Sequence, residues 1–174
     1  MESLPISTTS SSFHTRHRKV FKPKEPQIMA NPTGLEKIDY SFTPNMTINL
    51  DMIVTIDNKE NYGSFKFKNS TAYVNYRGDV VAEIPIGQNI VPAHGKLNIT
   101  SSTDFMIGKV ISNPNFLLDF IDGRLNLTSI AILHGKVNLF NIVKRHATAS
   151  SYCDISFKID DKNIQTICKS KINL

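Results

Sequence analysis

The histidines of this chain are the first residues to consider for metal or acid–base chemistry, and their spacing argues against both. They are His14, His17, His94, His134 and His146. His94 and His134 each precede a Gly-Lys pair, which is typical of a turn or bulge rather than of a ligand. No Cys or His cluster has the spacing of a zinc site, so we predict no metal and no cofactor.

The carboxylates are isolated in the sequence rather than paired. They are Asp51, Asp57, Glu60, Asp79, Glu83, Asp119 and Asp122. The chain also has no Gly-rich phosphate loop and no G-x-S-x-G elbow. We therefore predict that the protein is not an enzyme and has no small-molecule substrate.

The two cysteines, Cys153 and Cys168, stand on two segments that are predicted to form a hairpin. If Asp160 and Asp161 are the centre of its turn, paired residue numbers sum to 321, as 153 and 168 do. Directly opposed cysteines can reach disulfide distance, whereas a register slip would leave two small buried thiols. We favour the disulfide, which indicates an oxidising location.

Four N-glycosylation sequons indicate the same location. They begin at Asn45, Asn69, Asn98 and Asn126. Because the chain is rich in Asn, about two or three such triplets would arise by chance, so they support the disulfide rather than stand alone.

The net charge of +5 is concentrated in the N-terminal residues. Residues 1–25 hold five Lys or Arg against Glu2 and Glu25, a net of +3, and the remaining 15 basic and 13 acidic residues leave +2. A nucleic-acid-binding domain would carry its basic stripe on the folded part, so we predict no nucleic acid. The basic residues fit a solvated tail or, as the alternative, contact with an anionic membrane surface.

No apolar run approaches the roughly 18 residues that a membrane span needs, and no secretory signal is visible. On these residues alone, we expect a cytoplasmic protein. Residues 1–20 are rich in Ser and Thr, and 21–28 contain spaced prolines. We predict a disordered basic tail and linker over 1–27 and one folded domain over 28–174.

Alternating apolar residues predict the strands of that domain. In 47–57, TINLDMIVTID, apolar residues hold one parity and polar residues the other, except for Ile53. We expect this strand to be central in a sheet, with Asn49, Asp51 and Thr55 facing solvent and Ile53 either covered or an exposed contact. Further strands are predicted at 35–42, 64–68, 71–77, 80–86, 96–100, 125–133, 136–143, 151–159 and 163–172.

Other residues refine this arrangement. Pro85 lacks a backbone donor and predicts a sheet edge or a bulge. Asn113, Pro114 and Gly123 have the placement of an N-cap, a first helical residue and a C-terminal cap, which predicts a single short helix over 113–123. We expect Phe116, Leu117 and Phe120 to cluster on one side of that helix. The fold class is therefore all-β with one helix, an antiparallel sandwich of the fibronectin or immunoglobulin type.

Aromatic residues on the alternating segments offer two interpretations. They are Tyr62, Phe65, Phe67, Tyr73 and Tyr76. They could form an exposed recognition face, but aromatic residues on alternating strands more often belong to the core, which we favour.

The chain resembles the type-two late embryogenesis abundant domain of plants, in the branch related to disease-resistance and harpin-induced proteins. The resemblance runs from about Phe21 to Leu174. It is carried by FKPKEPQI, NMTINLDMIVTIDN, STAYVNYRGDVVAEIPI, LNIT, ISNPNFLLDF, HGKVNLFNIVKRHA, SYCDISFKI and IQTICKSKINL. It implies a fibronectin-like sandwich with one helix.

Two departures from the family pattern affect what can be transferred. Membrane-bound members carry a spanning helix before the stretch that corresponds to FKPKEPQI, whereas here HTRHRKV leads directly into it. We expect either a form that has lost this segment or a soluble variant. Residues 57–61, DNKEN, replace the usual Asn-Pro-Asn turn.

The resemblance implies a non-enzymatic binding or structural domain in plant stress or defence, held outside the plasma membrane. Such a role is compatible with a protein partner, which the sequence does not identify. The alternative from the broader family is a soluble intracellular protectant against desiccation.

Overall fold

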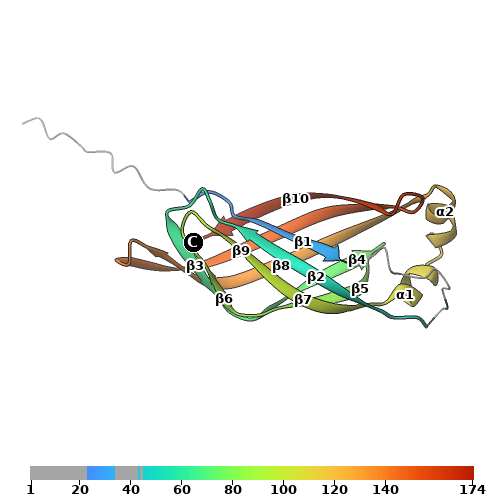
Figure 1. Ribbon diagram of the computed structural model, residues 1–174, viewed down its shortest axis with the longest axis horizontal. Coiled ribbons are helices and arrows are strands. Elements are labelled where there is room, and N and C mark those ends of the chain that lie inside the picture. The colour runs from blue at the N-terminus through green and yellow to red at the C-terminus, as the bar shows by residue number, and fades with distance from the viewer. Residues whose placement is uncertain (1–22, 34–42, 44) are drawn as a thin grey trace, which may run out of the picture.

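The computed structural model describes residues 23–33, 43 and 45–174 (Figure 1). The described residues form ten strands and two helices: β1 (Gln27–Thr33), β2 (Ile48–Asp57), β3 (Gly63–Phe67), β4 (Ser70–Tyr76), β5 (Asp79–Ile86), β6 (Asn89–Val91), β7 (Lys96–Phe105), α1 (Ile107–Ile111), α2 (Phe116–Ile121), β8 (Arg124–Leu139), β9 (Val143–Lys158) and β10 (Asn163–Asn173). The tail predicted over 1–20 and the strand predicted over 35–42 lie outside the described residues.

Two antiparallel sheets pack as a sandwich, which confirms the predicted fold class. One sheet has the order β1-β2-β7, and the other contains seven strands with the path β10-β9-β8-β3-β6. Strand β8 is a central strand of the larger sheet. Strand β9 pairs along one of its edges, and β3 and β4 pair with successive parts of the other edge. In Figure 1 both helices lie at one end of the sandwich and the β8–β9 turn lies at the opposite end.

Strand β2 is the centre of the smaller sheet, as its alternation predicts. Its apolar parity is buried, with Val54 and Ile56 each 1% exposed. Ile53 on the other face is 37% exposed, so the described residues leave it uncovered. Thr55 was expected to face solvent, but it is buried and donates a hydrogen bond to Asn98 Oδ1 over 2.9 Å.

Two strands, β1 and β6, were not predicted, and a third, β7, is longer than predicted. Strand β1 was not predicted and includes residues assigned to the linker, because its pairing with β2 supplies the order that the sequence pattern lacks. Strand β6 is too short to show a period. Strand β7 continues to Phe105 through residues of low apolar content, since β2 pairs along its whole length.

The separate strands predicted over 125–133 and 136–143 fall mainly in one continuous strand, β8, which ends at Leu139. Residues 140–142 form the β8–β9 turn instead, and Val143 begins β9. His134 was expected at a turn or bulge, but it pairs with Thr148 within the sheet. The glycine that follows serves close packing instead: a Cβ on Gly135 would lie 2.1 Å from the Lys66 carbonyl oxygen. His94, in contrast, has a φ of 53° and occupies a turn as expected.

The helix predicted over 113–123 is present as α2, but it is shorter, and α1 is a second helix outside the predicted range. The N-cap of α2 is Asn115, so the predictions of Asn113 as the N-cap and Pro114 as the first helical residue are wrong. Asn113 lies before α2, and its Oδ1 accepts a hydrogen bond from the Asn115 N–H over 3.0 Å. Gly123 has a φ of 70°, which suits the residue after a helix end. Helix α1 was missed because five residues are too few to show a helical period.

The core lies between the sheets, and the aromatic residues divide between it and the surface. Phe65, Phe67 and Tyr76 are buried, whereas Tyr62 and Tyr73 are 53% and 42% exposed. The expectation of core aromatics is therefore right for three and wrong for two. Pro85 lies on β5, whose only pairing among the described strands is with β4, so it stands at a sheet edge as expected.

Candidate functional site

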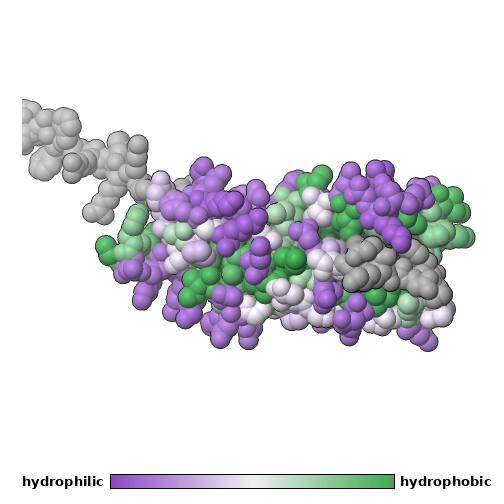
Figure 2. All heavy atoms as spheres, in the orientation of Figure 1, coloured by the Kyte–Doolittle hydropathy of each residue, from purple (hydrophilic) through white to green (hydrophobic). Residues whose placement is uncertain are grey.

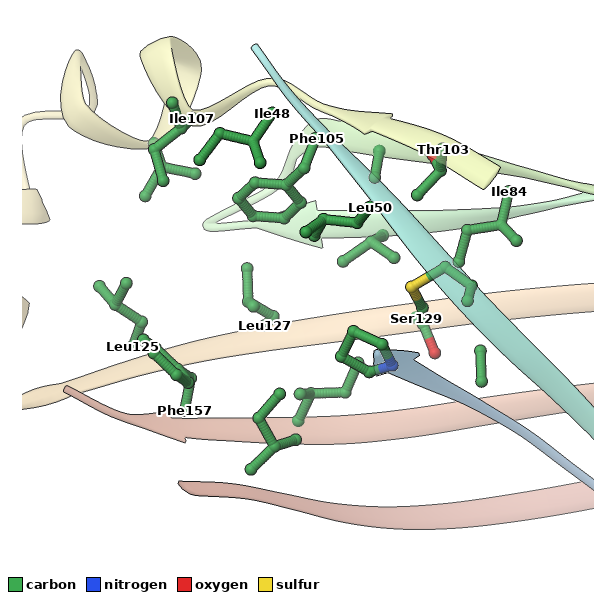
Figure 3. A pocket seen from close by; sticks show the side chains of 18 of the residues that line it. Ile48, Leu50, Ile84, Thr103, Phe105, Ile107, Leu125, Leu127, Ser129 and Phe157 are labelled. Carbon is green, nitrogen blue, oxygen red and sulfur yellow. The ribbon is translucent and has the colours of Figure 1, made fainter. Parts of the chain in front are cut away.

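An apolar cavity of about 140 Å³ lies between the two sheets, toward the helices (Figure 3). Strands β1, β2 and β7 of the smaller sheet contribute lining residues, as do strands β4, β5, β8, β9 and β10 of the larger sheet. Figure 3 shows the two sets of side chains that face this space: Ile48, Leu50 and Phe105 from β2 and β7, and Leu125, Leu127 and Phe157 from β8 and β9.

The cavity exists because the sheets are less tightly packed toward the helices. Along the inward face of β8, Leu133 is fully buried and Ala131 is 8% exposed, but Leu127 and Leu125 are only half-buried. Phe157 on the neighbouring strand is also half-buried. Apolar side chains that face the interior and still contact solvent form a surface on which another apolar group can be buried.

The lining is chemically simple. Its polar members are Thr103, Ser129 and Thr166, and none of the described lining residues is charged. The Thr103 hydroxyl already donates to the Glu83 carbonyl oxygen over 2.7 Å. A lining of this kind offers no acid, base or nucleophile matched to a reaction, but it suits the neutral hydrocarbon part of a ligand.

Helix α2 lies beside the cavity and is held there by a polar contact. Asp119 is the buried residue of this helix. Its Oδ2 accepts hydrogen bonds from the Tyr76 hydroxyl over 2.6 Å and from Arg77 Nε over 3.1 Å, and its Oδ1 forms an ion pair with Arg77 at 2.5 Å. Because Tyr76 is the last residue of β4 and Arg77 follows it, this contact fixes the helix to the larger sheet.

The same contact shifts three ionisation equilibria. Hydrogen bonding from Arg77 lowers the pKa of Asp119, and hydrogen bonding from Tyr76 acts in the same direction. Burial raises the pKa of Tyr76 to about 12, and its hydrogen bond to the Asp119 carboxylate adds to that increase. Hydrogen bonding to Asp119 raises the pKa of Arg77. The shifts fit a structural ion pair that holds the helix in place.

The apolar residues of α2 are divided between the cavity and the surface. Phe116 and Phe120 line the cavity, and their ring centroids are 5.7 Å apart. Leu117, predicted to lie with them, is instead 65% exposed, and Ile121 is 71% exposed. Figure 2 shows a hydrophobic surface over α2 at this end of the molecule. The helix buries a carboxylate and exposes aliphatic side chains, so its periodicity alone could not predict its orientation.

The predicted disulfide is confirmed. Cys153 and Cys168 are directly opposed in the β9–β10 pairing and form a disulfide with a Cα–Cα distance of 4.0 Å. Cys153 is buried, and its strand also contributes Phe157 to the cavity. The disulfide therefore joins the edge strand β10 to the wall of the site.

The four sequon asparagines are all exposed, at Asn45, Asn69, Asn98 and Asn126. Two of their side chains already make hydrogen bonds: Asn69 Oδ1 accepts from the Gln88 N–H over 2.7 Å, and Asn98 Oδ1 accepts from Thr55. Their modification stays a prediction.

The histidines and carboxylates that were considered for metal or acid–base chemistry form no such site among the described residues. His14 and His17 lie outside the described residues. Within the described part of the chain, no three His, Cys, Asp or Glu side chains are grouped so that they could hold a metal ion. Neither described helix has the length and hydropathy of a membrane span.

Sequence reasoning missed the cavity itself. The alternation of 125–133 and 151–159 correctly gives the inward parity, but it does not say how closely the opposite sheet approaches. The nearest signal is Ser129, a small polar residue on the inward parity of β8 that lines the cavity and fills less of the interior than an aliphatic residue would.

The chain was compared with family models, curated proteins and solved structures. No family model and no curated protein matches the chain. A solved structure described as the crystal structure of a protein from Archaeoglobus fulgidus is similar with a TM-score of 0.38 and 6% sequence identity, and the match covers 84% of this chain and 94% of that chain.

Proposed function

We propose that this protein is a non-enzymatic binding domain that holds the hydrocarbon part of a ligand in the apolar cavity. The observation that carries the proposal is the cavity between the sheets, lined by half-buried apolar side chains such as Leu125, Leu127 and Phe157. The polar end of such a ligand would stay in solvent, because the described lining provides no charged partner.

The size of the cavity defines what it can take. A dry cavity of about 150 Å³ lined by Leu, Ile and Phe is enough to bind benzene in another protein. The present cavity, of about 140 Å³, therefore suits part of an alkyl chain or one ring rather than a large polar metabolite.

The biological setting of the proposal comes from the sequence resemblance. We propose a role in plant stress or defence, with the sandwich outside the plasma membrane. The Cys153–Cys168 disulfide supports an oxidising location, and the exposed sequon asparagines are compatible with one.

A displacement titration tests the ligand class. Dodecanoate should displace a dansyl-labelled fatty acid from the protein with a saturable curve. Leu127→Trp places a large ring in the cavity and should weaken this binding by about tenfold or more, a loss of at least ~1.4 kcal/mol. No saturable binding to the folded protein would overturn the proposal.

The matched control is on the opposite face of the same strand. Ile130 is an outward-facing residue of β8 and is 38% exposed. Ile130→Trp should leave the titration unchanged, and both variants should unfold cooperatively. Equal weakening by both substitutions would place the ligand outside the cavity.

A further inference from the structure

The turn between β8 and β9, at the end of the sandwich opposite the helices, exposes a group of apolar side chains. We call residues 140–143 the hairpin tip. Phe140 is 64% exposed, Ile142 is 84% exposed and Val143 is 43% exposed. Figure 1 shows the hairpin tip projecting beyond the other strands at this end. Large apolar groups placed together on a projecting turn are costly in water unless something else covers them.

The backbone of the hairpin tip is also unusual. Phe140 and Asn141 have φ values of 51° and 58°, and the Ile142 N–H donates to the Leu139 carbonyl oxygen over 3.0 Å. A tight hairpin turn with two positive φ values favours Asn-Gly, and a bulky residue there is strained. An exposed phenylalanine held in such a conformation points to a functional role for its side chain.

A basic patch lies beside the hairpin tip on the outer face of the larger sheet. We define it as Lys66, Lys68, Lys136 and Lys144, all of which are exposed. Lys66 pairs directly with Lys136 across the sheet, and Lys136 pairs with His146. Like charges that are directly opposed repel each other, so an anion bound here would relieve the repulsion.

Acidic residues do not balance the basic patch. The sequences of β3, of β10 and of residues 133–149 contain no Asp or Glu. The acids from the adjoining loop are already near cations: Glu60 lies 2.9 Å from Lys24, and Asp57 lies 3.9 Å from Lys59. The field at this end therefore favours a negatively charged surface.

The described chain also begins at the same end. The Lys24 N–H donates to Asn61 Oδ1 over 2.8 Å, and the neighbouring Tyr62 ring lies 6.5 Å from the Phe140 ring. Residues 1–22, which precede this point, carry four Lys or Arg against Glu2. Their net charge has the same sign as that of the basic patch.

We propose that the hairpin tip and the basic patch form a docking surface for an anionic lipid bilayer. Phe140 and Ile142 enter the boundary between headgroups and acyl chains, while the basic patch contacts headgroup phosphates. The apolar cavity is at the other end of the sandwich, so the two sites can be occupied together. This proposal is independent of the cavity ligand.

Vesicle co-sedimentation of the full chain tests this docking. Binding should be strong to vesicles of phosphatidylcholine with phosphatidylserine, weak to phosphatidylcholine alone, and weaker as salt rises. F140S/I142S and K66Q/K136Q should each reduce binding to the anionic vesicles by about tenfold or more. Full binding by either double variant, or equal binding to neutral vesicles, would overturn the proposal.

Matched controls come from the helix end of the molecule. L117S/I121S removes aliphatic groups of similar exposure, and R124Q/K158Q removes another directly opposed basic pair. Both control variants should bind anionic vesicles like the unmodified protein, and equal loss in the controls would overturn the proposal. Self-association that F140S/I142S abolishes, without any vesicle binding, would identify the covering surface as a second copy and also overturn it.

Discussion

The Tyr76 hydroxyl donates a hydrogen bond of 2.6 Å to Asp119 Oδ2, which joins the end of β4 to helix α2. Tyr76 is fully buried and Asp119 is 7% exposed. Since Phe116 and Phe120 of the same helix line the cavity, this contact determines where the end of the cavity lies.

Replacement of Asp119 by Asn should destabilise the protein. Loss of the carboxylate removes the ion pair with Arg77 and weakens the partner of a buried hydroxyl, so we expect a loss of about 2 kcal/mol in the free energy of unfolding. Denaturant titration measures this loss. Asp122→Asn, at an exposed position next to the helix, is the control and should change stability little.

The contribution of Asp119 to the stability of the protein should decrease at acidic pH. Its pKa is lowered in the folded protein, so the unfolded chain takes up the proton first as the pH falls. The stabilisation is complete above the ordinary pKa of about 4 and is lost as the pH falls below it. The difference in stability between the unmodified protein and Asp119→Asn should therefore shrink in acid; an unchanged difference would contradict the assigned role.

Tyr76 should make stability fall in alkali. Burial raises its pKa to about 12, whereas a tyrosine in the unfolded chain ionises near ~10. The unfolded state therefore loses its proton first, and the stabilisation is lost as the pH rises from ~10 toward the folded value. Tyr76→Phe should lose this alkaline dependence of stability. Tyr73→Phe, the control at an exposed position, should keep it. Identical pH profiles for the two variants would contradict the prediction.

Reduction of the Cys153–Cys168 disulfide should destabilise the sandwich. In the chain-entropy model, closing a loop of this length contributes about 3 kcal/mol. Thermal unfolding with and without reductant measures the effect, and C153S/C168S should match the reduced protein. The thiol state in plant tissue separates the two proposed settings: a disulfide supports the location outside the membrane, whereas free thiols at both positions would favour the intracellular desiccation protectant.

The four sequons predict glycosylation when the chain passes through a secretory pathway. All four asparagines are exposed, so burial does not prevent modification. Enzymatic removal of N-glycans should lower the mass of the secreted protein, and N126Q should remove one increment. A secreted protein whose mass does not change on such treatment would contradict this prediction.

The strands that could be predicted are those in which apolar and polar residues alternate along the sequence. Strand β2 and the β9–β10 register, which opposes the cysteines, follow from a period of two and a short turn. Strand β1 could not be predicted this way, because its order comes from β2. Helix α2 was misjudged because the Tyr76 and Arg77 contacts bury its carboxylate, and these residues are remote in sequence. The cavity depends on the separation of two sheets, which no single strand encodes.

Methyl NMR during titration with dodecanoate tests binding in the apolar cavity most directly. The methyl groups of Leu50 and Leu127, on opposite walls of the cavity, should shift together and saturate at one ligand concentration. The methyl groups of Leu133, buried farther along β8, and of Ile142 in the hairpin tip should move little. Shifts confined to Ile142, or none at Leu50 and Leu127, would contradict a ligand held between the sheets.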